Sequence, residues 1–256
     1  MTYLITGSSK GIGRAIAESL SKISPKATRN ESAGEKALKQ LHDSGHKNVK
    51  FHQLDINDVA SRKKMHDYLS NQHGGLDVLV NNAGIYVKPS EKMPFMDEVR
   101  STLATNYFSP MELATELLPI MKNNGRIVNV GAKIGILGLN KISQENSDRI
   151  MNTKSLDELN AIVNEYIQLA EEKKLLKEGW ISMVYALSKT FINKASEILG
   201  QSVQNDPRNL IVTCCCPGSV KTDMTSQTGL LTAAEGAKTP VFLSNDINKE
   251  NNSNAD

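Results

Sequence analysis

Short apolar runs alternate along the chain with stretches in which apolar residues recur every three or four positions. "TYLIT", "NVKFHQLDI" and "LDVLVNNAG" are apolar runs, and the last is nearly continuous, as expected for a parallel strand covered on both faces. "GIGRAIAESLSKI" is the clearest helical stretch, with Ile12, Ile16, Leu20 and Ile23 at helical spacing. Repeated strand–helix units predict an α/β fold with a Rossmann-type doubly wound parallel sheet in a single domain.

The second half of the chain continues the alternation. A long helical stretch over 96–121 is interrupted near Pro110, and the buried strand "RIVNV" follows it. We expect a polar helical insert over about 141–179 and an amphipathic helix over 184–199. "NLIVTCCCPG" predicts another buried strand, and "TAAEGAKTPVFL" predicts a last helix. One domain is therefore expected over 1–243.

Two segments depart from this rhythm. A second strand is due between the first two helices, yet "SPKATRN" offers only Ala27 as an apolar residue. We therefore expect a degraded second strand, at most a stub over 26–29. The C-terminal residues 244–256 are polar, rich in asparagine and free of aromatic residues, so we expect a disordered tail.

Composition narrows the class of protein. The 256 residues carry a formal net charge of +2 with both signs interspersed, which argues against a nucleic-acid partner. No apolar run approaches the length of a membrane span, and "MTYLITG" enters a strand at once, leaving no room for a signal peptide. Cys214, Cys215 and Cys216 lack metal-ligand spacing, so we expect no metal site and interpret them as buried thiols of a cytoplasmic protein.

The glycine-rich stretch "TGSSKGIG" lies between the first strand and the first helix. Gly7, Gly11 and Gly13 allow a close approach of backbone to a pyrophosphate, and the helix N-terminus supplies N–H donors. The spacing is G-x-x-x-G-x-G rather than the general fingerprint G-x-G-x-x-G, so the strand–loop–helix context supports the interpretation. The loop, with Lys10 and Ile12 in it, predicts a dinucleotide cofactor.

Two further strand ends point to the same cofactor. Asp55 ends a strand, and its carboxylate can accept a hydrogen bond from the adenine amino group; a helix cap in "DIND" is an equally good interpretation, and Asp58 can cap the next helix. "NNAG" ends the next strand, where small residues let the backbone pass close to the adenosine ribose and the asparagines can tie strands together. The cofactor-binding residues expected here are Asn82, Ala83 and Gly84.

The choice between NADP and NAD depends on few residues. Arg29, at the end of the degraded second strand, and Lys10 in the glycine loop can both meet a 2′-phosphate. Glu31 lies near the position of a ribose-binding acid in an NAD enzyme, and Arg29 is alternatively a solvated loop charge. We favour NADPH/NADP+.

"YALSK" places Tyr185 and Lys189 at i and i+4, so both side chains project from one helix face. Tyrosine is a poor acid or base at neutral pH because its pKa is about 10. A nearby ammonium favours the phenolate and lowers that pKa. A surface pair is the ordinary interpretation of this spacing, but beside the glycine loop and "NNAG" we interpret the pair as a general acid/base device.

These motifs occur in order with Asn106 in "LATNYF" and with "PGSVKTDM". Together they resemble the short-chain dehydrogenase/reductase family. "FHQLDI", "GGLDVLVNNAGI", "TELLPIMK", "KEGW" and "CCCPGSVKTDM" resemble its NADPH-dependent carbonyl reductases. The resemblance covers about 3–243. It implies hydride transfer from NADPH to a ketone, aldehyde or quinone, and a monomer whose insert covers the surface through which many relatives pair.

The resemblance also implies residue roles. Tyr185 would give the proton, and Lys189 would hold the nicotinamide ribose and lower the tyrosine pKa. Asn106 would kink its helix and hold a water that links Lys189 to solvent; from the residues alone, it is a helix-interior amide. The loop after the last strand would meet the carboxamide and neighbouring parts of the cofactor, through Pro217, Gly218, Val220, Thr222 and Asp223.

One position departs from the family pattern. The family ends the fifth strand with a serine pair whose second serine donates to the substrate carbonyl, whereas this chain has Gly131 and Ala132. Lys133 follows, and no serine or threonine appears until Ser143. Losing one such donor costs about 10²–10³ in rate. We expect weak carbonyl reduction; the alternative is a member that binds NADP(H) or a protein partner without turnover.

Overall fold

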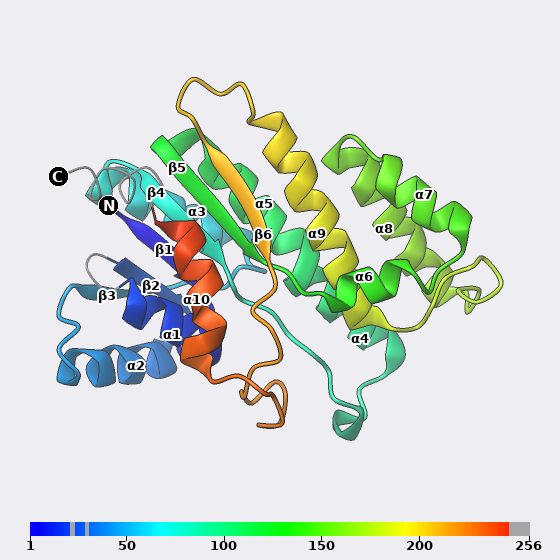
Figure 1. Cartoon of the computed structure of the whole chain (residues 1–256), viewed down its shortest axis with the longest axis horizontal. Coiled ribbons are helices and arrows are strands. Elements are labelled where there is room, and N and C mark those ends of the chain that lie inside the picture. Colours follow the sequence, from blue (N-terminus) through cyan, green and yellow to red (C-terminus); the bar gives the residue numbers. More distant parts are fainter. Residues whose placement is uncertain (21–23, 29–30, 246–256) are drawn as a thin grey trace, which may run out of the picture.

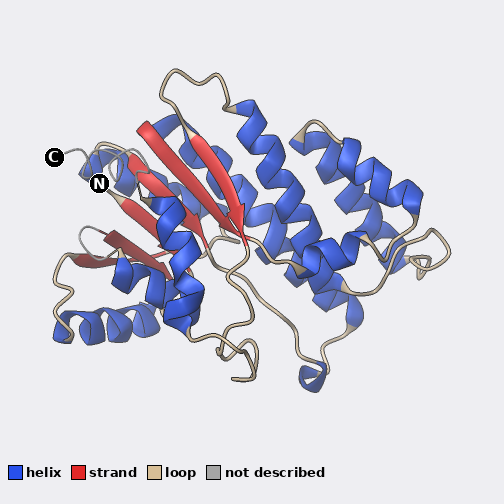
Figure 2. Ribbon diagram, viewed as in Figure 1, coloured by secondary structure: helices blue, strands red, loops and turns tan. Residues whose placement is uncertain are grey.

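The computed structural model describes residues 1–20, 24–28 and 31–245. Within them, six parallel strands form one sheet in the order β3-β2-β1-β4-β5-β6, with helices on both sides (Figures 1 and 2). This order confirms the predicted doubly wound sheet, because the chain reverses its winding direction between β1 and β4. The strands are β1 (Tyr3–Thr6), β2 (Ser24–Thr28), β3 (Val49–Gln53), β4 (Leu76–Asn81), β5 (Met121–Val130) and β6 (Ile211–Cys215).

The two faces of the sheet bury separate apolar clusters. On one face α1 and α10 pack against residues such as Val80 and Val128. On the other face α3, α4, α5 and α9 enclose a larger cluster that includes Leu79 and Ile127. The bounds of these helices, and of α2 beside β2 and β3, are α1 (Gly11–Ser19), α2 (Glu31–Asp43), α3 (Val59–His73), α4 (Phe95–Leu103), α5 (Ser109–Leu117), α9 (Val184–Ser202) and α10 (Ala233–Ser244).

The second strand forms despite its polar composition. β2 begins at Ser24, two residues before the predicted stub, and is paired on both sides. Lys26 pairs with Ile5 of β1 and with Phe51 of β3. The expectation of a stub at most is therefore wrong, because backbone hydrogen bonds to two neighbours do not require apolar side chains. Arg29 lies outside the described residues, as does the predicted tail from residue 246 onward.

The long helical stretch is broken by a π turn, Ala104–Phe108, between α4 and α5. Directly after this turn, the Ser109 N–H donates to the Ala104 carbonyl, five residues back. Pro110 has no N–H, so it cannot bond to the Asn106 carbonyl as an α-helix requires. The break therefore lies before Pro110. A short 3₁₀ turn, Leu118–Ile120, follows α5, and β5 begins at Met121, five residues before the predicted strand.

The segment over 141–179 is helical, as predicted. It contains α7 (Gln144–Asn152) and α8 (Leu156–Glu171), which lie beyond α4 and α9 in Figure 1. Ser143 and Ser155 cap the two helices by accepting backbone N–H bonds. The α8 face is joined to the main core by Tyr166, which packs against the rings of the buried residues Trp180 and Phe191.

The cysteine residues lie at the sheet edge. Cys215 is buried, whereas Cys214 and Cys216 are partly exposed, and all three are free thiols. The prediction of buried thiols is therefore wrong for two of them, because β6 pairs only with β5 in the described sheet and Cys216 lies beyond its end. Across the described ranges, none of the helices combines the length and apolar character needed to cross a membrane.

Candidate active site

The glycine loop joins β1 to α1 and lies directly against the end of β4. Gly7 has φ +64°, and a Cβ there would come within 2.9 Å of the Ala83 Cα. A Cβ on Gly13 would meet the Asn82 side chain and come within 2.6 Å of the Gly7 carbonyl oxygen. Two of the three glycines are thus required by close backbone packing, while Gly11, with φ +57°, faces Thr222.

The N-terminus of α1 has donors available for an anion. Lys10 occupies the N-cap position without a side-chain cap, and within the described residues no acidic residue lies in the first turn. Uncapped N–H groups and the positive end of the helix dipole suit a phosphate group. The residues present therefore fit a dinucleotide pyrophosphate. Ile12 is partly buried and packs against the smaller apolar cluster, and its predicted cofactor contact stays a prediction.

The end of β4 is tied to both neighbouring strands. The Thr6 hydroxyl accepts hydrogen bonds from the backbone N–H groups of Asn82 and Ala83. The Asn82 side chain donates to the Thr6 carbonyl oxygen at 2.9 Å. On the other side, Asn81 Nδ2 donates to Asn129 Oδ1 of β5 at 2.9 Å. These bonds confirm that the asparagines of "NNAG" connect strands.

Asn106, in the π turn, joins the segment after β4 to α9. Its Oδ1 accepts from the Ile85 N–H at 2.8 Å, and its Nδ2 donates to the Ile85 carbonyl at 2.9 Å and to Ser188 Oγ at 3.1 Å. The side chain therefore satisfies backbone groups outside its own helix. Its predicted water-holding role stays a prediction.

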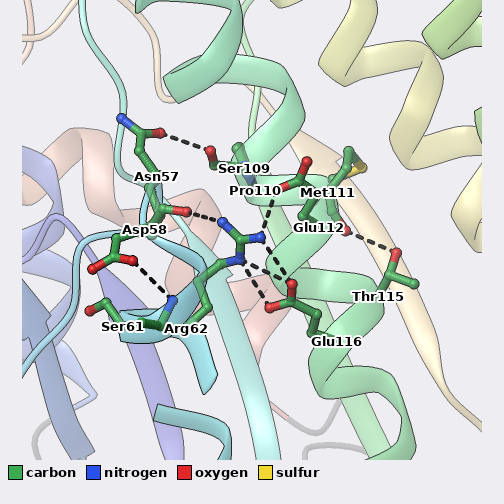
Figure 3. A network of polar contacts seen from close by, with 12 residues as sticks. Asn57, Asp58, Ser61, Arg62, Ser109, Pro110, Met111, Glu112, Thr115 and Glu116 are labelled. Carbon is green, nitrogen blue, oxygen red and sulfur yellow. Dashed lines mark hydrogen bonds and ion pairs between the residues drawn. The ribbon is translucent and has the colours of Figure 1, made fainter. Parts of the chain in front are cut away.

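A polar network behind this turn fixes its position (Figure 3). Asn57 donates to Thr105 Oγ1 and accepts from Ser109 Oγ, so it holds the turn on both sides of Asn106. Arg62 is only 3% exposed and reaches from α3 to Glu116 of α5 with Nε–Oε2 2.9 Å. These contacts tie the turn to the loop before α3, and α3 to α5.

Asp55 and Asp58 separate the two interpretations of "DIND". Asp58 is the N-cap of α3, accepting from the Ala60 N–H, which confirms that prediction. The Asp55 carboxylate instead accepts from the Asn57 N–H at 3.0 Å within its own loop. Asp55 is therefore not the helix cap, and its predicted role at the adenine stays a prediction.

Tyr185 and Lys189 occupy one face of α9, as predicted. The Lys189 Nζ lies 5.9 Å from the centre of the Tyr185 ring and donates to the Val130 carbonyl at 2.8 Å. Lys189 is 8% exposed, and the Tyr185 hydroxyl points toward the Met224 sulfur at 3.9 Å. Lys189 thus meets the carboxyl end of β5, and Tyr185 faces the loop after β6.

Burial determines the acidity of both groups. It raises the pKa of Tyr185 to about 12 and lowers the pKa of Lys189 to about 8. Burial is the largest cause of the raised pKa of Tyr185. The lowering of that pKa by Lys189, whose ammonium bonds to a backbone carbonyl, stays a prediction. Tyr185 is accordingly a protonated hydrogen-bond donor at neutral pH.

The end of β5 carries no hydroxyl, and its space is occupied by other residues. A Cβ on Gly131 would meet Asn193 Oδ1 and come within 2.6 Å of the Cys214 sulfur. Asn193, one turn after Lys189, also donates to the Ala132 carbonyl at 3.2 Å. Gly131 therefore has no room for a serine side chain, which leaves Ala132 as the position of the missing hydroxyl.

A cavity of about 370 Å³ opens beside Tyr185. Its apolar walls include Tyr86, Met93, Ile134 and Met183. The Tyr86 ring packs edge-on against the Tyr185 ring, with centroids 5.1 Å apart. This cavity can receive an organic molecule whose polar atom reaches the tyrosine hydroxyl.

The loop after β6 folds over the glycine loop. Gly218, with φ +84°, packs against Leu231, and Val220 pairs with Leu231 in an isolated parallel bridge. Asp223 forms an ion pair with Lys10 at 2.8 Å, which holds its pKa below the usual range. Pro217 and Thr222 are the remaining predicted members of this loop. The Thr222 N–H donates to Thr225 Oγ1.

The structure therefore gathers most predicted residues at one sheet edge, but not all. The glycine loop, the segment after β4, Tyr185 and the loop after β6 meet there. Arg29 lies outside the described residues, so the predicted phosphate contact remains a prediction. Sequence reasoning missed Tyr86 and Asn193; the one available signal was that Tyr86 follows "NNAG" by two residues.

Comparison with known proteins gives independent support for this arrangement. The short chain dehydrogenase family model matches residues 1–144. Carbonyl reductase [NADPH] 1 and carbonyl reductase [NADPH] 3 of Rattus norvegicus are 36% and 37% identical over 247 residues. In both cases the match covers 94% of this chain and 89% of the relative.

Solved structures show the same fold. Salutaridine reductase from Papaver somniferum superposes with a TM-score of 0.85 at 27% sequence identity, covering 95% of each chain. Menthone neomenthol reductase from Mentha piperita gives a TM-score of 0.78 at 21% identity, which shows the shared fold alone. The glycine loop and the tyrosine–lysine helix thus lie in a fold shared with reductases.

Proposed function

Because the chain belongs to the short-chain dehydrogenase family, we propose that it reduces ketone, aldehyde or quinone carbonyls to alcohols with NADPH. The observation that carries this proposal is the position of Tyr185, which lines the cavity with Lys189 one helical turn away. The similarity to carbonyl reductases supports the reaction class and the cofactor.

The cofactor would lie along the carboxyl edge of the sheet and supply a hydride. Its pyrophosphate would meet the backbone at Gly11 and the uncapped N-terminus of α1. The adenosine ribose would pass the small residues Ala83 and Gly84. Lys189 has an ammonium directed at the end of β5, where it can bind a ribose hydroxyl.

The protein's own chemistry centres on Tyr185. With a pKa near 12, its hydroxyl remains protonated at neutral pH and can donate to a carbonyl oxygen in the cavity. As negative charge develops on that oxygen, the proton moves from the phenol to the alkoxide. The ammonium of Lys189, charged below pH about 8, stabilises the phenolate that remains.

The missing serine bounds the rate. Removing one donor from an oxyanion site costs about 10²–10³ in rate. Ala132 contributes no hydroxyl, so we propose slow reduction. A water molecule beside Ala132 would replace the hydroxyl in part.

A direct test compares the wild type with Ala132→Ser. NADPH binding is measured by cofactor fluorescence, and turnover is measured with a quinone or with isatin. We expect binding in both proteins, slow turnover in the wild type and an increase in kcat/KM of up to about 10²-fold in Ala132→Ser. An equal, unmeasurable turnover in both proteins with NADPH bound would contradict the proposed reaction.

The side chains that occupy the space at the end of β5 favour a second function. Asn193 and Cys214 occupy the space beside Gly131, so that position cannot hold a serine without rearrangement. We propose as an alternative that the chain binds NADP(H) or a protein partner without turnover. NADPH binding without turnover, together with activity in Ala132→Ser, would favour this alternative.

We further propose that the chain is a monomer. Support comes from α8, whose buried residues Leu159, Val163 and Tyr166 pack against the core beside α4 and α9. In the proposed monomer, this packing would cover the surface through which the resemblance implies that many relatives pair. Size-exclusion chromatography with light scattering tests the proposal, and a stable dimer would refute it. The free thiols suit a cytoplasmic location, which cell fractionation would test.

A further inference from the structure

The cavity beside Tyr185 is lined by a second phenol, that of Tyr86, which takes no part in the proton transfer from Tyr185. We propose that the Tyr86 hydroxyl donates a hydrogen bond to the substrate carbonyl oxygen, in place of the hydroxyl absent from Ala132. This inference rests on the proposed function and adds a catalytic residue to it.

Tyr86 is held close to the reacting position. Its ring packs edge-on against that of Tyr185, with centroids 5.1 Å apart and planes 66° apart. The preceding residue, Ile85, is fixed by two hydrogen bonds to Asn106, one from its N–H and one to its carbonyl. The backbone that carries Tyr86 is thus fixed by the same side chain that holds α9 through Ser188.

The Tyr86 hydroxyl is available to a ligand. The side chain lines the cavity with Tyr185 and is 40% exposed. Among the described residues, no group forms a hydrogen bond with its hydroxyl. By contrast, the buried phenols of Tyr107 and Tyr166 donate to protein oxygens. A phenol without a protein partner at an apolar cavity is suited to bind a polar atom of a guest molecule.

Ser182 is the other hydroxyl-bearing residue besides the two tyrosines in the described lining of this cavity. It lies before α9, in a turn where its carbonyl accepts the Val184 N–H. Tyr86 packs directly against the Tyr185 ring, which places its phenol beside the proton donor. This ring contact assigns the donor role to Tyr86, and Ser182 is the matched control.

The step balances without an additional reactant. Hydride adds to the carbonyl carbon, the C=O π bond becomes a lone pair on oxygen, and the Tyr185 proton moves to that oxygen. Tyr86 keeps its proton throughout and contributes a hydrogen bond. Because the oxygen is most negative in the transition state, this bond strengthens there and acts on kcat more than on KM.

The test uses Tyr86→Phe, which retains the ring and removes only the hydroxyl. We expect kcat for isatin to fall by about 10²-fold, while the NADPH dissociation constant and the melting temperature stay at wild-type values. Ser182→Ala should retain wild-type kcat. A loss that appears in Tyr86→Phe, with ring packing intact, cannot be a packing effect.

Introducing Ala132→Ser provides the second readout. A serine at position 132 would supply the donor, so Tyr86→Phe should lower kcat less in that background than in the wild type. Wild-type kcat in Tyr86→Phe would overturn the inference while leaving the proposed function intact. So would an inactive wild type beside an active Ala132→Ser. If wild type and Ala132→Ser are both inactive with NADPH bound, the proposed function fails, and this inference fails with it.

Discussion

The carboxyl ends of β4 and β5 are neighbours at one sheet edge, yet they are built differently. At the end of β4, Asn82 and Ala83 form hydrogen bonds with Thr6 of the neighbouring strand β1, and a Cβ on Gly7 would clash with Ala83. At the end of β5, Gly131 and Ala132 have no polar side chains, and residues from distant segments fill the space.

The difference shows which strand end can be predicted from a local motif. The β4 end is specified by residues within "NNAG" and the glycine loop, whose types match their contacts. The β5 end depends on Asn193 from α9 and Cys214 from β6, which no local pattern connects to it. The β4 end is therefore specified by local motifs, whereas the β5 end is specified by residues that are distant in sequence.

The largest effect is expected at Tyr185. Its ring contacts Tyr86, which follows the β4 end, and lies near Lys189, which contacts the β5 end. Tyr185→Phe removes the proton donor and should lower kcat/KM by about 10³-fold without changing NADPH affinity. Steady-state kinetics and fluorescence titration measure the two quantities. Tyr68→Phe, on α3, is the control and should behave as wild type; equal activity of both variants would show that the proton has another source.

A smaller effect is expected from filling the β5 end. Gly131→Ser places a Cβ against Asn193 and Cys214, and should lower the free energy of unfolding by about 1–3 kcal/mol. Adding Asn193→Ala should restore part of that stability, as measured by urea unfolding.

Gly200→Ser is the matched control for this experiment, because the nearest atom to a Cβ there is 3.5 Å away. It should cost less stability than Gly131→Ser. If Asn193→Ala gives no relief, the β5 end is not shaped by Asn193 and the contrast with β4 loses its physical basis.

The smallest effect concerns the pH dependence of stability. The Lys189 pKa is about 8 in the folded protein against an ordinary lysine pKa of 10.5, so between these values the unfolded chain binds more protons than the folded one. Stability from this group therefore rises with pH in that window, by at most about 1.4 kcal/mol per pH unit. Below pH 8 both the folded and the unfolded chain bind this proton, so the group no longer makes stability change with pH.

Lys189→Met removes this titration. Urea unfolding at pH 8 and pH 9 should show wild type gaining stability relative to Lys189→Met. The pKa of Cys215 is raised mainly by burial, which is present in both proteins. Parallel behaviour of the two proteins would mean that the ammonium is not desolvated at the β5 end.

The fold could be predicted where side-chain periodicity determines structure. Ile12, Ile16 and Leu20 gave α1, and the continuous apolar run gave β4. β2 could not be predicted, because its pairing with two neighbours depends on backbone groups that carry no side-chain signal. The exact place of the helix break before Pro110 was also set by a backbone effect.

The site was predicted where one motif contains all of its contacts. Tyr185 and Lys189 were found from their i, i+4 spacing, and Asn82 from "NNAG". The pKa of Tyr185 was not, because it depends on burial by residues from several segments. Tyr86 and Asn193 were missed for the same reason: their importance comes from contacts across the fold and not from neighbours in sequence.

The order of strands in the sheet has a consequence for how the chain folds. β1 is the first strand to be synthesised, yet it lies inside the sheet and pairs with β4, where Tyr3 meets Val78. Parallel pairs so distant in sequence give a high contact order, which is associated with slow folding. A nascent chain that ends before β4 has its glycine loop without the wall that Ala83 and Asn82 provide, and the loop that folds over the glycine loop follows only after β6 ends at Cys215.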